Sequence, residues 1–500
     1  MKNNIINISG NPFLQRSAED ELDFLEEIYY KPVYYDELID NAINGASRML
    51  VGQRGLGKSA TIHFLFKELK QNQTLPLLIT RYDDIPLNNN EPYFLYKIMQ
   101  SLCNGIAHYL FVNKKARKNL SKYQKEQLAF FIELFFDPQT SEEYVTSAKE
   151  IKQKQRWNII RKFYNRSLPL INGLLNGAIE FGSDFIRKSL GISIDDVSIE
   201  NVAREYLKEA DLLRINSIPI DEVVLWEKEK LIKLLKQLKE IANTIGYKSI
   251  VILFDKIDEY PEINANVDKI VDFVKDILLD TDFLYTKGLS IIFSIWSDAK
   301  RALNKVGVRF DKFEDINIEW DDTELEMLIN KRLEYYTINK EHPVTMGSLL
   351  PQISDRKLVL SLSNKSPRAL IKLLGTFYSL EHNSNGINCF NPETLAKGMM
   401  QYCLSYDYYS NQSVKVGGKI DLYGWINKIL QIKRTSFTAD AVKAEFVLTP
   451  KSTNTYIQSM MRYELIKENI RPDEDGKTIY DVIDPRIQFL ISRGVSELHG

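Results

Sequence analysis

The strongest chemical signal in this sequence is the segment Gly52-Gln-Arg-Gly-Leu-Gly-Lys-Ser59, which fits the pattern G-x-x-x-x-G-K-[ST] at every fixed position. Its glycines let backbone N–H groups approach a phosphate without side-chain clashes. Lys58 adds a cation for the phosphates, and the Ser59 hydroxyl can ligate Mg²⁺. We predict a phosphate-binding loop whose binding residues are Gly52, Gly55, Gly57, Lys58, Ser59 and Ala60.

A carboxylate that can hold Mg²⁺ follows a second apolar run. Residues 250–254 read as a buried strand, and Asp255 comes directly after it. In a parallel sheet this position lies at the carboxyl edge, where ligands bind. Asp258 and Glu259 follow, and either can polarise an attacking water or belong to a helix cap or solvated loop. We predict Ser59 and Asp255 as metal ligands, and which carboxylate acts as the base stays open.

These two segments together resemble the AAA+ and STAND branch of P-loop NTPases. The run ILFDKIDE has a D-x-x-D-E spacing that is similar to the Walker B segment of NACHT-type STAND proteins. That pattern prefers a small residue after the first Asp, where this chain has Lys256. Residues 11–13 and 34–38 resemble the adenine-side region that precedes the loop in such ATPases. The resemblance implies ATP and Mg²⁺ as cofactors and hydrolysis of ATP.

The same resemblance implies roles for residues further along the chain. Ser294 and Ser297 match the place of a polar sensor of the γ-phosphate. Pro367 matches the proline of the STAND G-x-P motif, although the glycine of that motif is missing, and Arg368 matches the sensor-2 arginine of AAA+ proteins. Arg309 either reaches a neighbouring subunit or forms a surface salt bridge. The predicted catalytic residues are Asp258, Glu259, Ser297 and Arg368, and Pro367 is added to the residues that bind the cofactor.

Strand and helix patterns alternate around these residues. Apolar runs at 48–52, 75–80, 249–254, 289–295 and 316–318 read as strands, with helical spacing between them. This alternation predicts an α/β fold, a P-loop NTPase core with a parallel sheet covered on both faces. Residues 92–247 show mostly helical spacing and are predicted to form a large helical insertion.

The chain after residue 320 predicts two further domains. Residues 321–409 read as helices, which we interpret as a lid, and 410–418 read as a linker. The order of the last elements is that of a winged helix: a helix at 438–446, a turn, a helix at 452–467, a polar hairpin and a strand at 478–483. The predicted domains are a core at 1–320, a helical lid at 321–409 and a winged helix at 410–500.

Charge patterning limits the contacts with nucleic acid. Lys plus Arg total 65 against 67 Asp plus Glu, so only a local patch can attract phosphates. Residues 113–166 hold thirteen Lys or Arg and six Asp or Glu, a bias typical of nucleic-acid binding or of a solvated helix face. The winged helix offers Lys451, Asn454, Gln458 and Arg462 on its second helix, whereas its hairpin carries Asp473, Glu474 and Asp475.

Other classes of protein are disfavoured by composition. Three widely spaced cysteines and five scattered histidines give neither a disulfide framework nor a metal clamp. The N-terminus lacks the apolar core of a signal peptide, and the apolar stretch 168–194 contains four charged residues, which argues against a membrane span. We expect a cytoplasmic protein.

Three functions fit these observations. The first is an ATP-dependent molecular switch of the AAA+/STAND type, acting as a homo-oligomer or with a separate effector protein, and the resemblance implies the ATPase component of an antiphage defence system. The second is a DNA-handling ATPase similar to the Orc/Cdc6 or transposition-targeting groups. The third is a scaffold that binds ATP without hydrolysing it, which Lys256 keeps open.

Overall fold

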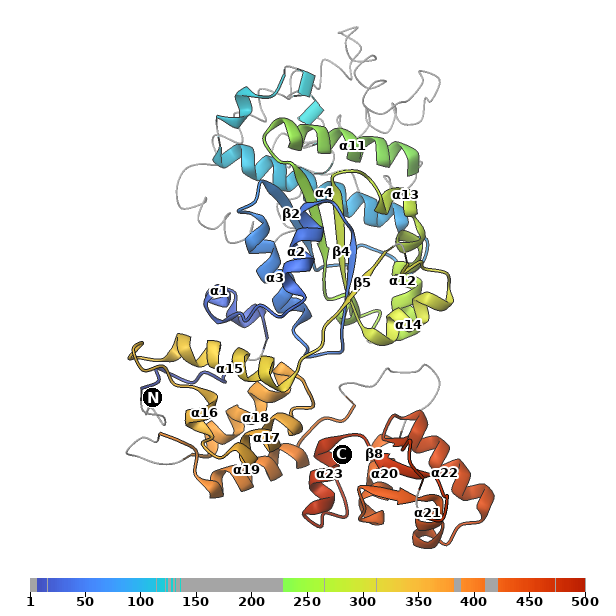
Figure 1. Ribbon diagram of the computed structural model, residues 1–500. Helices are drawn as coiled ribbons and strands as arrows, with labels where there is room; N and C mark the ends of the chain where they lie inside the picture. Colours follow the sequence, from blue (N-terminus) through green and yellow to red (C-terminus); the bar gives the residue numbers. More distant parts are fainter. Residues whose placement is uncertain are drawn as a thin grey trace. The chain divides into compact units, whose positions relative to one another are not determined.

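The computed structural model describes residues 7–121, 228–381, 388–409 and 421–499, apart from a few single positions, and some positions between 123 and 135. The chain divides into two compact units, and many of their elements are labelled in Figure 1. The first unit holds Met1–Val33, Gly52–Phe64 and Ile318–Gly500, and the second holds Tyr34–Val51 and Leu65–Asn317. The predicted linker at 410–418 and most of the basic region at 113–166 lie outside the described residues.

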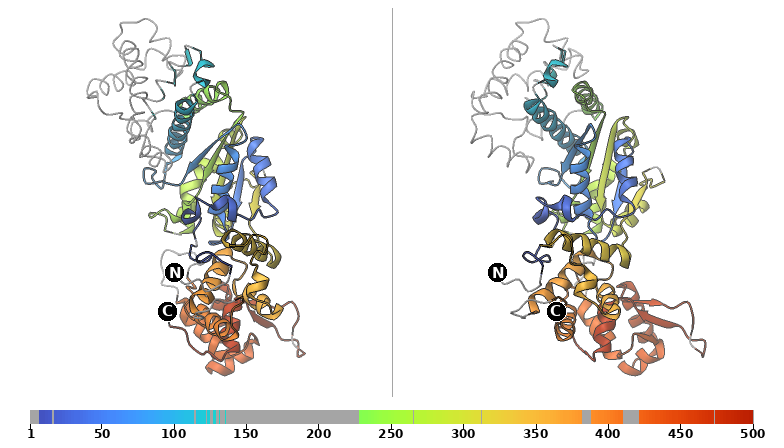
Figure 2. Two further views of the ribbon diagram at one scale, coloured as in Figure 1. Left: turned by 90° about the vertical axis from the view of Figure 1, so that its left-hand side faces the viewer. Right: turned by 60° about the vertical axis from the view of Figure 1, so that its left-hand side comes forward.

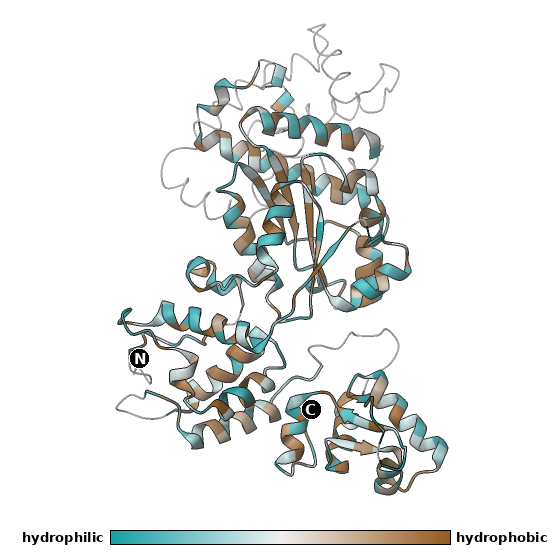
Figure 3. Ribbon diagram, in the orientation of Figure 1, coloured by the Kyte–Doolittle hydropathy of each residue, from teal (hydrophilic) through white to brown (hydrophobic). Residues whose placement is uncertain are grey.

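The second unit is built on a parallel sheet of five strands in the order β2-β3-β4-β1-β5. The strands are β1 (Arg48–Val51), β2 (Thr74–Ile79), β3 (Ser249–Phe254), β4 (Leu289–Ile295) and β5 (Asp315–Asn317). β3 and β4 are buried along their whole length, and Figure 3 shows the strands of this sheet as largely apolar. Continuous apolar runs are what a sheet covered on both faces requires. The predicted α/β fold with a parallel sheet is confirmed.

Helices cover both faces of this sheet, with α2 on one side and α4 and α11 on the other (Figure 2). α2 (Tyr35–Ile43) packs on β1, β3 and β4, while α4 (Glu91–Val112) packs on β2 and on α11 (Lys228–Thr244). α12 (Val267–Leu279) packs against α4 and α14 (Ser297–Lys305), and α13 (Thr281–Leu284) packs against β4. α4 and α11 are the two ends of the predicted insertion, and residues 136–227 between them lie outside the described part of the chain.

The first unit holds the glycine-rich segment and a group of helices after residue 320. Short helices η1 (Glu19–Glu21) and α1 (Leu25–Ile28) come first, and α3 (Lys58–Leu69) begins here and ends in the second unit. The helices of the predicted lid are α15 (Asp322–Tyr336), α16 (Met346–Leu349), α17 (Ile353–Leu362), α18 (Pro367–Leu380) and α19 (Pro392–Leu404). α18 and α19 pack closely, because a Cβ atom on Gly398 would lie 2.4 Å from Phe377 Cδ1.

The C-terminal part of the first unit combines helices with a small antiparallel sheet in the order β6-β8-β7. Its elements are α20 (Leu422–Ile432), β6 (Ser436–Thr438), α21 (Ala439–Phe446), α22 (Pro450–Arg462), β7 (Ile466–Glu468), β8 (Ile479–Val482) and α23 (Pro485–Ser492). The helix predicted at 452–467 was too long. It ends at Arg462 because Glu464 takes a left-handed conformation, and Lys467 pairs with β8 instead. No helix among the described residues is long and apolar enough to cross a membrane.

Candidate functional site

The glycine-rich loop at residues 52–57 follows β1 in the chain and leads into α3. Gly55 and Gly57 have φ angles of +83° and +95°, a region that side chains other than glycine enter only with strain. A Cβ atom on Gly52 would lie 3.3 Å from Ile318 Cβ and 3.4 Å from Leu56 Cδ1, which is a crowded position. At each glycine of the predicted motif, the backbone conformation or the lack of space therefore disfavours a larger residue.

Lys58 folds back over this loop. Only 8% of the residue is exposed, and its ammonium donates hydrogen bonds to the carbonyl oxygens of Gly52 at 2.9 Å and Gln53 at 3.2 Å. A buried ammonium is costly unless oxygen atoms surround it. The loop therefore holds a positive charge where the motif predicts phosphate binding.

The start of α3 adds backbone donors to this charge. The first hydrogen bond of the helix runs from the Thr61 N–H to the Gly57 carbonyl, so the N–H groups of Lys58, Ser59 and Ala60 precede the internal bonds of the helix. Such groups lie at the positive end of the helix dipole. Together with Lys58 they form an arrangement that binds an anion such as phosphate.

Donors from elsewhere in the first unit hold the carbonyl groups of the loop. The Trp320 Nε1 donates to the Leu56 carbonyl at 2.9 Å. The Gly55 carbonyl accepts two hydrogen bonds of 3.3 Å, from the Ser366 hydroxyl and from the Arg368 backbone N–H. In a trans peptide the carbonyl and the following N–H point in opposite directions. Holding these carbonyls on one side therefore turns the next N–H groups to the other side, as a phosphate cradle requires.

The start of α18 lies against this loop. Pro367 is the first residue of the helix and is buried, and the Ser366 hydroxyl caps the helix by accepting a hydrogen bond from the Ala369 N–H at 3.3 Å. Arg368 approaches Gly55 through its backbone, while the residue is exposed overall. The structure thus brings the predicted residues Pro367 and Arg368 to the loop, and their roles stay predictions.

Asp255 and Ser294 are neighbours on the sheet of the second unit. Phe254 of β3 pairs with Phe293 of β4, and their rings stack at 4.5 Å, so the next residues of the two strands also lie side by side. Each of the two is 1% exposed, and neither Asp255 Oδ2 nor the Ser294 hydroxyl has a hydrogen-bond partner among the described residues. Two buried oxygens without partners suit a hydrated Mg²⁺ ion, because Mg²⁺ prefers oxygen ligands and keeps several waters.

The backbone beside Asp255 is held by a residue that sequence patterns did not indicate. The Tyr82 hydroxyl donates to the carbonyl oxygens of Asp255 at 2.7 Å and Ile79 at 3.0 Å. Burial raises the pKa of Tyr82 well above its usual value, and the Asp255 carboxylate raises it further. The hydroxyl therefore stays protonated and keeps donating.

The carboxylates after Asp255 differ in their surroundings. Lys256 has φ of 63° and ψ of 23°, a left-handed conformation, and it precedes the short helix η3 (Ile257–Glu259). In this helix Asp258 is 7% exposed, whereas Glu259 is exposed. Both stay candidates for the base that activates the attacking water, Asp258 as a buried carboxylate and Glu259 as an exposed one.

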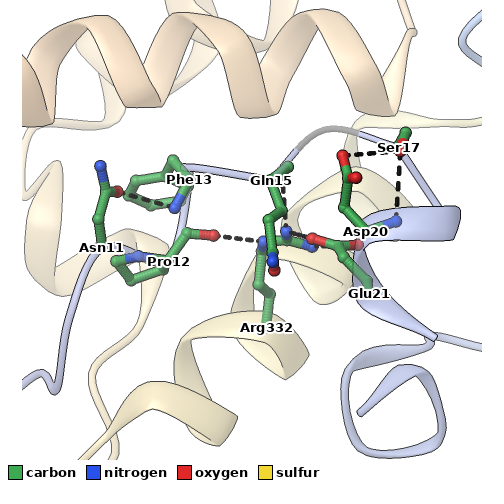
Figure 4. A network of polar contacts seen from close by, with 8 residues as sticks. All are labelled: Asn11, Pro12, Phe13, Gln15, Ser17, Asp20, Glu21 and Arg332. Atoms are coloured by element: carbon green, nitrogen blue, oxygen red, sulfur yellow. Dashed lines mark hydrogen bonds and ion pairs between the residues drawn. The ribbon is translucent and has the colours of Figure 1, made fainter. Parts of the chain in front are cut away.

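The N-terminal segment at 11–13 is fixed within the first unit by a buried arginine of α15 (Figure 4). Arg332 donates to the Pro12 carbonyl and forms an ion pair with Glu21, while the Phe13 ring contacts the Tyr378 ring edge-on at 6.3 Å. Residues 34–38, the other segment with an adenine-side resemblance, lie at the start of α2 in the second unit.

The remaining candidates belong to other elements of the two units. Ser297 is the first residue of α14 rather than part of β4, so of the two candidate serines Ser294 is the one that lies within the strand. Arg309 is exposed and pairs with Asp311 through two hydrogen bonds, of 3.0 Å and 2.6 Å. The four residues of α22 predicted to face nucleic acid are all exposed: Lys451, Asn454, Gln458 and Arg462.

Similarity to known proteins is found among solved structures. No family model and no curated protein matches the chain. Among solved structures it is similar to the ORC2 protein of Aeropyrum pernix in ADPNP-ADP complexes, with a TM-score of 0.41 and 9% identity over 95% of this chain and 97% of that chain. It is also similar to the ORC1 protein of Aeropyrum pernix in complex with DNA (TM-score 0.36, 11% identity, 96% and 95% covered) and to Cdc6p of Pyrobaculum aerophilum (0.33, 10%, 97% and 98%). All these scores are below 0.5, so a function has to rest on the residues of this chain.

Proposed function

We propose that this protein is an ATP-binding switch of the AAA+/STAND type and that it hydrolyses ATP with Mg²⁺. The observation that carries the proposal is the loop at residues 52–59, where a buried Lys58 ammonium, the first N–H groups of α3 and outward-held carbonyls meet. This arrangement presents positive charge and backbone donors to one phosphate group.

The metal and the catalytic carboxylate are the finer part of this proposal. Ser59 and Asp255 are the proposed Mg²⁺ ligands, the second through water, and the buried Asp255 Oδ2 without a partner supports this role. Asp258 or Glu259 orients the attacking water. The wider role that we propose, an ATPase of an antiphage defence system acting as an oligomer or with a separate effector, rests on the resemblance of the motifs.

Calorimetry with ATP and Mg²⁺ tests the binding site. Lys58→Ala removes the cation of the loop and should weaken ATP binding about tenfold or more, since a hydrogen bond to a charged group contributes roughly 1.5–3 kcal/mol. Lys70→Ala, at an exposed lysine just after α3, is the matched control and should bind as the wild type does. Unchanged affinity in Lys58→Ala would refute the proposal. ATP binding without turnover would instead identify the non-hydrolysing scaffold.

A second candidate function, DNA handling, is favoured by one observation. Lys451, Asn454, Gln458 and Arg462 recur along α22 at intervals of three or four residues and are all exposed, so they share one face of the predicted second helix of a winged helix. The exposed Glu474 and Asp475 oppose this role by repelling phosphates. The affinity for duplex DNA, measured at several salt concentrations, tests this function. If Arg462→Ala lowers the slope of log binding constant against log salt by about one, DNA binding is supported, and an absence of binding at low salt rejects it.

A further inference from the structure

We infer that Ser366 is a positioning residue for phosphate binding, and that its hydroxyl makes the start of α18 respond to the nucleotide in the loop. The inference rests on the proposed function, because it assigns a regulatory contact to the same loop. It concerns the backbone of the loop rather than the Arg368 guanidinium.

The Ser366 hydroxyl joins two structural elements with a single oxygen. It donates to the Gly55 carbonyl at 3.3 Å, and it accepts from the Ala369 N–H at 3.3 Å as the cap of α18. The two groups are in close contact, since a Cβ atom on Gly55 would lie 3.0 Å from this hydroxyl and 3.2 Å from Arg368 Cβ. A shift of the Gly55 carbonyl therefore changes the environment of the first turn of α18.

The turn before Ser366 fixes the place of this hydroxyl. Asn364 and Lys365 both have left-handed φ angles, 48° and 59°, a conformation that asparagine tolerates and that lysine adopts only at a cost. The Ser366 N–H donates to the Ser363 carbonyl at 3.1 Å, and the buried Ser363 hydroxyl donates to the Leu360 carbonyl at 2.6 Å. A lysine in the left-handed region persists where the surrounding structure determines its conformation, which is a common feature of switch regions.

The Gly55–Leu56 peptide carries the link to the phosphate. Its carbonyl is held by Ser366 and Arg368, and within the described part of the chain its N–H makes a long hydrogen bond of 3.4 Å to the Gln53 carbonyl. A phosphate oxygen is a stronger acceptor than that carbonyl, so a bound nucleotide should take over this N–H. Because both groups belong to one rigid peptide plane, fixing the N–H also fixes the carbonyl. Nucleotide binding and the Ser366 contact then stabilise each other, as linkage requires.

The affinity for ATP is the first measurement. Ser366→Ala removes the hydroxyl and should weaken ATP binding about 2- to 10-fold, the effect of one neutral hydrogen bond. Ser366→Thr keeps a hydroxyl and should restore the wild-type affinity. A Thr variant that is as weak as the Ala variant would contradict a role for the hydroxyl.

Hydrogen exchange of residues 366–374 is the second measurement, because the Arg368 and Ala369 N–H groups donate directly to Gly55 and Ser366. Saturating ATP should slow this exchange in the wild type. In Ser366→Ala the slowing should fall by half or more. Ser366→Asp keeps an acceptor for the helix cap but cannot donate to Gly55, so it should also lose the slowing while α18 keeps its protection without nucleotide.

Trp320→Phe separates the link to α18 from a general loosening of the loop. It removes the Nε1 donor to Leu56 and keeps the ring, so it should weaken ATP binding yet leave the slowing at saturating ATP intact. If Ser366→Ala binds ATP and retains the wild-type slowing, this inference alone is overturned. If the wild type binds no nucleotide, the proposed function and the inference fail together.

Discussion

Arg332 and Glu21, 311 residues apart in the chain, form a buried ion pair that joins α15 to the N-terminal segment. They are 3% and 6% exposed, and the guanidinium also donates to the carbonyls of Pro12 and Gln15 (Figure 4). Burial lowers the pKa of Arg332 to about 10, so the guanidinium is charged at neutral pH and needs the carboxylate beside it. The pair therefore fixes the segment at 11–13 inside the first unit.

Glu21→Gln should destabilise the first unit strongly. It leaves a buried charge without a counter-ion, which typically costs about 3–5 kcal/mol. Asp20→Asn is the matched control, because Asp20 is exposed and such surface changes cost about 0.5 kcal/mol or less. Urea unfolding of both variants measures the difference, and equal stabilities would show that Arg332 does not depend on Glu21.

Asp255→Asn should remove the effect of Mg²⁺ on ATP binding and turnover, because it removes the negative charge and keeps the size of the side chain.

Ser294→Ala should lower turnover and leave the affinity for Mg²⁺-ATP unchanged, if its hydroxyl holds a water. Ser290→Ala on the same strand is the control, since the Ser290 hydroxyl already donates to the Ala46 carbonyl at 2.8 Å. Loss of turnover in Ser290→Ala but not in Ser294→Ala would reverse this assignment.

The sheet and the phosphate loop could be predicted because their signals are local. Strands buried on both faces are continuous apolar runs, as at Ser249–Phe254, and the loop is a fixed pattern of glycines before Lys58. The end of α22 could not be predicted, because no proline or glycine comes directly after Arg462, and the left-handed Glu464 and the pairing of β7 with β8 end the helix. Tertiary contacts override local propensity at such points.

The residues that support the loop were also missed, for a related reason. Trp320 contacts Leu56 across 264 positions of sequence, and Ser366 contacts Gly55 across 311. Neither residue belongs to a short motif, so spacing alone carries no signal for them. The local signal at Ser366 is a serine directly before a proline, and this pair indicates the start of a helix rather than a contact with the loop.

Lys256→Gly should stabilise the second unit by about 0.5–1 kcal/mol. Lys256 has a left-handed conformation, whose cost for a residue with a Cβ atom exceeds the entropy that glycine adds to the unfolded chain. Lys256→Ala keeps the Cβ atom and should give no such gain, which makes it the control. Chemical unfolding measures both, and a Gly variant that is less stable than the Ala variant would show that the lysine conformation is not strained.

Arg368→Ala should weaken the binding of ATP about 10- to 100-fold and leave the binding of ADP nearly unchanged. The backbone N–H of residue 368 holds the Gly55 carbonyl, and alanine keeps this bond, so only the cation is lost. The guanidinium belongs to an exposed residue at the start of α18, whose backbone contacts the loop, and we expect a phosphate oxygen as its partner. One charge-assisted hydrogen bond contributes roughly 1.5–3 kcal/mol, and only ATP offers a γ-phosphate for it.

Lys365→Ala is the control for this last prediction, because Lys365 is an exposed cation in the same turn and should affect both nucleotides little. Arg368→Lys keeps the charge but not the planar fork of donors, so it should recover part of the ATP affinity. Calorimetry with ATP and with ADP gives the ratio of the two affinities for each variant. A ligand shifts a conformational equilibrium of a protein only through contacts that differ between the two conformations. A residue that contacts the γ-phosphate must therefore affect the binding of ATP more than the binding of ADP. Equal losses for the two nucleotides would assign Arg368 to general phosphate binding, and no loss for either would leave it as a surface residue of α18.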